Sequence, residues 1–304
     1  MDTIYKNFYR SFYIKTEGFI PTIPLNQNVY PGDFFQIKNG EMIVLGNIFR
    51  NAIIDKEDVT FDTATILNPA NWNFSDGVTK PYSGRGIGHE VIEGEFEFTK
   101  QILAFAAKGS FIFKAENPEA IKILNWSDIQ QQLIIKLTQT FYSFREVYVV
   151  TECAITASTT LAIAGSKNAE LEIASDTENF GLIDIFGHSS AKTIQSKDIE
   201  YYHRENKRKP IYFKAKKLAV QDEKVDAFIS NLASSNQTKM EWVNDFFDFN
   251  FDYDSVDNLL VSNEAKACLL EMLQANELNP NTALLYFKWI DANLDDIEKL
   301  FLSY

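Results

Sequence analysis

Seven basic side chains lie within the fourteen residues 204–217, where Glu205 is the single acidic residue. Lysine and arginine at this density can contact phosphate groups, either of nucleic acid or of an anionic lipid surface, where each contributes about 1 kcal/mol. A solvated basic loop is the alternative interpretation. The net charge of −13 and the lack of a nucleic-acid-binding module favour lipid. The residues are Arg204, Lys207, Arg208, Lys209, Lys214, Lys216 and Lys217.

Catalytic motifs are missing from the sequence. It contains no Gly-x-Ser-x-Gly elbow, no HExxH and no P-loop. With three histidines in the chain, a dyad of Cys153 with His203 can be drawn, but nothing nearby orders it. Cys153 falls on the apolar side of an expected strand, so we interpret it as a buried structural thiol. We therefore predict no enzyme and no cofactor, and keep an enzyme that uses Cys153 and a histidine as a third hypothesis.

Two further patterns resemble ligand-binding loops in part. Residues 84–88 (GRGIG) precede an alternating segment at 92–98 rather than the helix that a dinucleotide loop opens, so we expect a β-turn. The alternate acidic and amide residues of 248–254 have the spacing of a calcium loop. Tyr253 replaces the required glycine and Leu259 the required glutamate, so no metal site is predicted.

The same C-terminal stretch alternates aromatic with acidic or amide side chains. An extended segment of this kind would show an aromatic face and an acidic face. It could be an ordinary edge strand or loop that anchors the C-terminal helices. The sharper hypothesis is a detachable plug that covers an apolar and basic surface of the preceding domain. The autoinhibitory residues would then be Phe247, Phe249, Phe251 and Tyr253.

Period-2 alternation dominates the first 220 residues and predicts β structure. The longest such run is 147–163, with a largely apolar side and a small, mostly polar side. Because strands average about 5–6 residues, this run is either two strands or one very long strand. Residues 92–98, 169–173 and 211–219 are predicted as further strands.

Helical spacing also marks several segments, including 263–275. Residues 126–137 carry apolar side chains at helix spacing, and residues 281–300 are expected to form a helix capped by Asn279 with Pro280 at its first position. At 2–12 an aromatic stripe lies on a short helix beside two basic residues. This stripe matches an interfacial membrane anchor or, equally, a helix packed on the domain core. Its residues are Tyr5, Phe8, Tyr9 and Phe12, with Lys6 and Arg10 pointing elsewhere.

Charge divides the chain into unequal parts. The 304 residues suggest about two domains. Residues 236–304 hold 13 acidic and 4 basic side chains, which is most of the excess negative charge. We predict a domain at 1–232, a polar linker at 233–240 and an acidic, helical segment at 241–304. No transmembrane helix or signal peptide is recognisable, so a cytoplasmic protein is expected.

A family resemblance is carried by the stretch 146–152 (EVYVVTE), by residues 154–164 after it, and by 209–218 (KPIYFKAKKL). Together they resemble the second half of the pore-forming domain of gasdermins, particularly the bacterial members. Residues 109–115 (GSFIFKA) are similar to the strand before the central helix of that family. The similarity covers roughly residues 90–220.

The resemblance implies an α+β fold, with a twisted, mainly antiparallel sheet, peripheral helices and a small C-terminal helical segment. It also implies that the C-terminal segment keeps a cytoplasmic monomer inactive. An activating protease would cut the linker, with Lys239 as a candidate position. The released domain would bind acidic lipids of the inner membrane, form a homo-oligomer and extend two β-hairpins into a pore, which causes cell death in antiviral defence. The resemblance implies no role for nucleic acid.

The residues acquire roles from this resemblance. The lipid-binding set comprises Tyr5, Lys6, Phe8, Tyr9 and Arg10 together with the seven basic residues of 204–217. The membrane-strand set comprises Val147, Val149, Cys153, Ile155, Leu161 and Ile163. The competing hypothesis is a non-enzymatic protein- or nucleic-acid-binding module whose basic strand is masked by the acidic tail.

Overall fold

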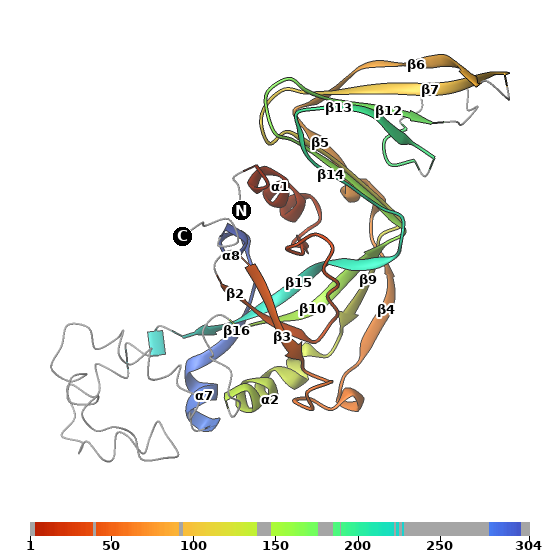
Figure 1. Cartoon of the computed structure of the whole chain (residues 1–304). Helices are drawn as coiled ribbons and strands as arrows, with labels where there is room; N and C mark the ends of the chain where they lie inside the picture. The colour runs from red at the N-terminus through yellow and green to blue at the C-terminus, as the bar shows by residue number, and fades with distance from the viewer. Residues whose placement is uncertain are drawn as a thin grey trace.

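The computed structural model describes residues 4–38, 41–90, 94–138, 147–175, 185–188, 190–221, 223–224, 227 and 280–298. The cleavage candidate Lys239, the linker, the expected helix at 263–275 and the plug residues Phe247, Phe249, Phe251 and Tyr253 lie outside these ranges, and so stay predictions. Over the described ranges the fold is α+β, with three mainly antiparallel sheets and few helices (Figure 1).

The largest sheet, called sheet A, has eight strands. Its central path runs β1–β15–β10–β2–β3, with β16 added to β15 and with β9 and β4 added beside β10. The strands are β1 (Ile20–Pro21), β2 (Asp33–Lys38), β3 (Glu41–Asn47), β4 (Phe61–Ile66), β9 (Glu119–Ile123), β10 (Val147–Thr156), β15 (Lys209–Val220) and β16 (Phe287–Asp291).

Two four-stranded sheets continue from it. Sheet B has the order β14–β11–β8–β5 and sheet C the order β13–β12–β7–β6. The strands of sheet B are β5 (Asn73–Asp76), β8 (Phe111–Glu116), β11 (Ser158–Ala164) and β14 (Ile199–Glu205). Those of sheet C are β6 (Val78–Glu90), β7 (Gly94–Phe105), β12 (Ala169–Ser175) and β13 (Lys192–Lys197).

Four continuous runs of chain therefore pass through all three sheets in one lateral order. They are β4–β5–β6, β9–β8–β7, β10–β11–β12 and β15–β14–β13, and they bend where one sheet ends and the next begins (Figure 1). Each bend between sheets B and C contains one residue with a left-handed backbone. These four corner residues are Gly77, Gly109, Asn168 and Asp198.

The predicted run 147–163 forms two strands, β10 and β11, separated by Ala157. The expectation of one polar side is wrong for β10, because the sheet is covered on both faces. Tyr148 and Val150 pack in the cluster that includes α1 (Lys6–Lys15), whereas Val147 and Val149 pack with α2 (Trp126–Thr138).

Two other expectations are corrected. Residues 84–88 belong to strand β6 and pair with β7, so the predicted β-turn is wrong. The predicted single helix at 281–300 is instead α7 (Pro280–Tyr286), the strand β16 and α8 (Leu294–Glu298). The short 3₁₀ helices are η1 (Lys56–Asp58) and η2 (Pro69–Trp72).

Phe12 anchors α1 in the core, and its ring lies 4.9 Å from that of Tyr212 and 5.4 Å from that of Trp72. We expect Phe12→Ala to lower the free energy of unfolding by about 3–5 kcal/mol, because the change leaves a cavity among these rings. Ile14→Ala on the same helix is the control, since Ile14 is 61% exposed and should cost under about 0.5 kcal/mol. Denaturant unfolding measures both; equal costs would show that α1 is not anchored by Phe12.

Candidate functional site

The basic strand β15 is covered along one edge by the C-terminal part of the chain. We call residues 280–298, which comprise α7, β16 and α8, the lid. Strand β16 pairs antiparallel with β15 from Lys216 opposite Asp291 to Val220 opposite Phe287. The backbone amide of Ala292 continues the pairing by donating to the carbonyl of Ala215. The lid thus completes sheet A at the place where its most basic strand would otherwise present a free edge.

Acidic side chains of the lid meet basic side chains of the domain. Asp291 Oδ1 lies 2.6 Å from Lys216 Nζ, and Asp296 Oδ1 lies 2.9 Å from Lys217 Nζ. On α1, Lys6 Nζ lies 3.4 Å from a carboxylate oxygen of Glu298. The lid therefore neutralises cations from both groups of predicted lipid-binding residues, the α1 group and the β15 group.

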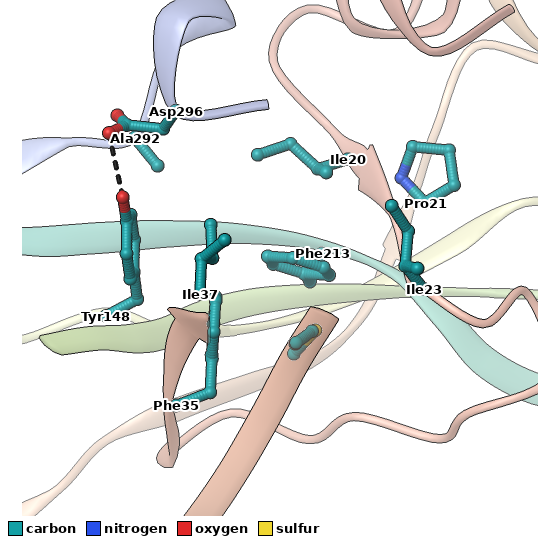
Figure 2. Close-up of a pocket in the computed structure, with 10 residues that line it drawn as sticks. Ile20, Pro21, Ile23, Phe35, Ile37, Tyr148, Phe213, Ala292 and Asp296 are labelled. Atoms are coloured by element: carbon teal, nitrogen blue, oxygen red, sulfur yellow. Dashed lines mark hydrogen bonds between the residues drawn. The ribbon is translucent and has the colours of Figure 1, made fainter. Parts of the chain in front are cut away.

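Asp296 is the most enclosed of these carboxylates, and it also accepts a 2.8 Å hydrogen bond from the hydroxyl of Tyr148 (Figure 2). Burial acts to raise its pKa. Hydrogen bonds from Lys217, the backbone of Asn293 and Tyr148 outweigh burial, so the pKa of Asp296 lies below its ordinary value. Its charge therefore stabilises the closed lid at neutral pH, and this contribution is lost only as the pH falls below about 4.

The local sequence explains how α8 presents Asp296. The side chain of Asn293 accepts hydrogen bonds from the amides of Asp295 and Asp296, and the carboxylate of Asp296 accepts one from the amide of Asn293. This reciprocal arrangement is a capping box, which starts the helix and fixes the side chain at its third position. The carboxylate is thereby held towards Tyr148 and Lys217.

Apolar contacts hold the other half of the lid. The indole of Trp289 lies edge-on to that of Trp126 at 5.4 Å and donates a 2.9 Å hydrogen bond to the carbonyl of Gln130. Ala283, Tyr286 and Phe287 are buried against α2 in the same cluster. Removing the lid would therefore expose apolar surface as well as cations.

A narrow apolar cavity of about 10 Å³ lies beneath the far end of the lid (Figure 2). Its volume is close to that needed for one water molecule, so the surfaces of lid and domain fit together closely. Ala292 and Asp296 of the lid close it against the central path of sheet A. The remaining lining residues are Ile20, Pro21, Ile23, Phe35, Ile37, Met42, Tyr148 and Phe213.

The other predicted basic residues lie on β14, β15 and the turn between them, and most have partners within the domain. Arg208 pairs with Glu119 and Lys209 with Glu205. Lys214 Nζ lies 3.5 Å from Glu152 and 4.4 Å from the centre of the Phe19 ring. The guanidinium of Arg204 donates to the carbonyls of His188 and Ala191, and Lys207 is exposed in the turn.

The aromatic stripe of α1 faces inwards. Phe8 and Tyr9 are buried and Tyr5 is half-buried, so the structure has the core-packed arrangement that was one of the two interpretations. Arg10 is exposed on the opposite side of the helix. Contact of Phe8 or Tyr9 with lipid would require α1 to leave the domain.

The predicted membrane-strand residues do not form one set in the folded chain. Val147, Val149, Cys153 and Ile155 lie on β10 in sheet A, whereas Leu161 and Ile163 lie on β11 in sheet B. All except Ile155 are buried, so they form part of the packed core in this conformation.

Cys153 lies on β10 in sheet A, whereas His203 lies on β14 in sheet B. The thiol is fully buried, and burial, together with Asp33 and Glu152, raises its pKa to about 12. Burial also lowers the pKa of His203.

We expect Cys153, as the single thiol of a Cys268→Ser variant, to be alkylated roughly 1000-fold more slowly in the folded protein than in urea at pH 8. A thiol with a raised pKa forms thiolate only as the pH climbs towards that value. Iodoacetamide labelling followed by mass spectrometry measures the rate. Rapid labelling of the folded protein would restore the enzyme hypothesis.

Sequence reasoning missed the residues that join the lid to the domain, namely Asp291, Asp296 and Trp289 of the lid and Tyr148 of β10. The available signals were the β-forming residues of 287–291 (FKWID) and the Asn-x-x-Asp spacing at 293–296, which marks a helix start and breaks the expected long helix.

Comparisons with known proteins give a structural likeness. No family model matches the chain, and no curated protein matches it. Among solved structures, a bacterial gasdermin from Bradyrhizobium tropiciagri is similar over 66% of this chain and 81% of its own, with 10% identity and a TM-score of 0.28. Within the described ranges, the helices are all too short or too polar to cross a bilayer.

Proposed function

We propose that this protein is an autoinhibited pore-forming effector. Proteolysis in the linker 233–240 would release the lid, after which the N-terminal domain binds acidic lipids, oligomerises and permeabilises the cell membrane. The closed monomer is cytoplasmic and the pore lies in the inner membrane. No catalytic step by the chain itself is part of this proposal.

The observation that carries the proposal is the shared strand order of sheets A, B and C. Residues 61–123 and 147–220 form two hairpins whose runs stay neighbours from one sheet to the next. Straightening the bends would lengthen each hairpin without exchanging strand partners. A membrane strand needs about 9–11 residues, which each run provides within sheets B and C. Pairing such strands around a closed ring satisfies the backbone polar groups in lipid.

The lid supports the regulatory half of the proposal. It binds Lys216 and Lys217 on β15 and Lys6 on α1, which are cations that an anionic membrane would otherwise attract. One segment thereby blocks a basic surface and covers apolar residues. The family resemblance of residues 90–220 implies the same order of events.

The experiment is a cut at the linker followed by a leakage assay. A site for a sequence-specific protease replaces residues 233–239 of the full chain, and dye-filled vesicles contain either phosphatidylcholine alone or phosphatidylcholine with phosphatidylserine. We expect leakage only after the cut and only from the anionic vesicles. If the cut protein causes dye leakage from neither kind of vesicle but retards DNA in a salt-dependent gel shift, the pore-forming proposal is wrong and the nucleic-acid-binding alternative takes its place.

A further inference from the structure

Strands β16 and β3, which lie at the two edges of the five-stranded part of sheet A, run in the same direction. Neighbours along β16–β15–β10–β2–β3 are all antiparallel, so β16 and β3 run the same way at opposite edges. A second copy placed beside the first without inversion would therefore bring its β3 antiparallel to β15. That is the orientation in which β16 pairs with β15 now.

The register is also continuous across these five strands. Ile290 lies opposite Lys217, Lys217 opposite Tyr148, Tyr148 opposite Phe35, and Phe35 opposite Val44. At the same level of a neighbouring copy, Val44 would take the place of Ile290. Both residues are apolar and β-branched, so the exchange keeps the character of the contact.

Strand β3 has the properties of an open edge. Within the described ranges it pairs with β2 alone. Ile43 and Val44 are 41% and 37% exposed, and Glu41 is the single charged residue of the strand. An exposed apolar edge is a template for another strand, and proteins usually protect it with charge or cover. Here no basic residue on β3 would repel Lys216 and Lys217.

We propose that β16 occupies the place of the next subunit: when the lid leaves, the β15 edge of one copy pairs with the β3 edge of a second copy of this chain. This inference rests on the proposed function and supplies its oligomer contact. The contact joins unlike edges, so it repeats head to tail and builds a ring if the rotation closes. With β16 in place, each copy has its β15 edge filled and assembly cannot start.

A disulfide between introduced cysteines tests the contact. In one chain, positions 44 and 217 are separated by two intervening strands, which is about 14 Å at the usual strand spacing. A disulfide needs Cα atoms within about 7 Å, so a bond between cysteines at these two positions must join two copies. The test protein is the full chain with Val44→Cys, Lys217→Cys and Cys268→Ser, opened by Asp291→Lys and Asp296→Lys, and oxidised on phosphatidylserine-containing vesicles.

We expect trimers and higher ladders on a non-reducing gel, whereas each variant with a cysteine at one of the two positions forms dimers at most. The same double-cysteine chain with Asp291 and Asp296 retained should form fewer ladders than the opened chain, because Lys217→Cys removes the ion pair with Asp296 but leaves the pairing of β16 with β15 and the ion pair of Lys216 with Asp291. Leakage without a ladder would overturn the β3–β15 contact and leave the pore proposal standing. A ladder without leakage would support the contact and count against the pore.

A substitution without cysteines provides the second measurement. Because Ile43 is exposed, Ile43→Asp should leave folding intact and reduce leakage by the opened protein about tenfold or more, with vesicle binding unchanged. Leu124→Asp is the matched control, since Leu124 is a 54% exposed apolar residue that lies outside both hairpins and outside β3. Equal effects of the two changes would contradict the specific contact.

Discussion

The double charge reversal Asp291→Lys and Asp296→Lys is expected to make the uncut, full-length protein leak dye from phosphatidylserine-containing vesicles. Asp296 and Lys217 are largely enclosed, and breaking a buried pair costs about 3–5 kcal/mol. The exposed carboxylate of Asp291, at 83%, adds under about 1 kcal/mol. Since about 1.4 kcal/mol is tenfold, a loss of about 3 kcal/mol raises the open population, and the initial leakage rate, by about two orders of magnitude.

The control for this variant is Asp295→Lys. Asp295 is next to Asp296 on α8, and it makes no side-chain ion pair among the described residues. Its reversal changes net charge without touching the contacts of Tyr148 or Lys217. If Asp295→Lys leaks as fast as the double reversal, the effect comes from overall charge and the lid contacts do not hold the protein closed.

Reversal of the basic strand is expected to abolish membrane binding by the cut protein. Each lysine near an anionic leaflet contributes about 1 kcal/mol of attraction, and a glutamate in its place adds a repulsion of about the same size. Changing Lys214, Lys216 and Lys217 to Glu should therefore cost about 6 kcal/mol of binding free energy and lower the vesicle partition coefficient more than roughly 1000-fold. The new glutamates also repel Asp291 and Asp296, so the lid should bind the domain less firmly in this variant. A loss of vesicle binding therefore cannot result from a lid that covers β15 more firmly.

Vesicle sedimentation measures this partition coefficient. Raising the salt concentration should also weaken vesicle binding by the cut protein that keeps its native lysines. The matched control changes Lys38, Lys56 and Lys136 to Glu, three exposed lysines outside 204–217, with the same change in net charge. An equal loss in both variants would mean that charge alone governs binding. Unchanged binding of the first variant would show that β15 does not face the membrane.

Much of the domain was predictable because its signals are local. Alternation over 147–163 predicted β10 and β11, the pattern of 211–219 predicted β15, and helical spacing predicted α1 and α2. The prediction of a buried Cys153 thiol is confirmed. The two-sided burial of β10 was not predictable, because it depends on α1 and α2 covering opposite faces of one sheet.

The lid shows the limit of local patterns. Residues 281–300 have apolar positions that suit a helix, yet 287–291 become a strand because β15 offers hydrogen bonds along its edge. This pairing joins segments about seventy positions apart, and strand preference depends strongly on such neighbours. The contact between Tyr148 and Asp296 was likewise not predictable, because no spacing in the sequence indicates it.

The four corner residues between sheets B and C should influence how quickly the released domain permeabilises a membrane. Asn168 and Asp198 adopt a backbone geometry that costs a non-glycine residue about 1 kcal/mol, whereas a continuous strand would relieve it. A β-branched residue at either position should shorten the lag between release and permeabilisation, and glycine should lengthen it. The speed of conversion and the tightness of inhibition could then evolve separately, because the first depends on the corners and the second on the contacts of Asp296.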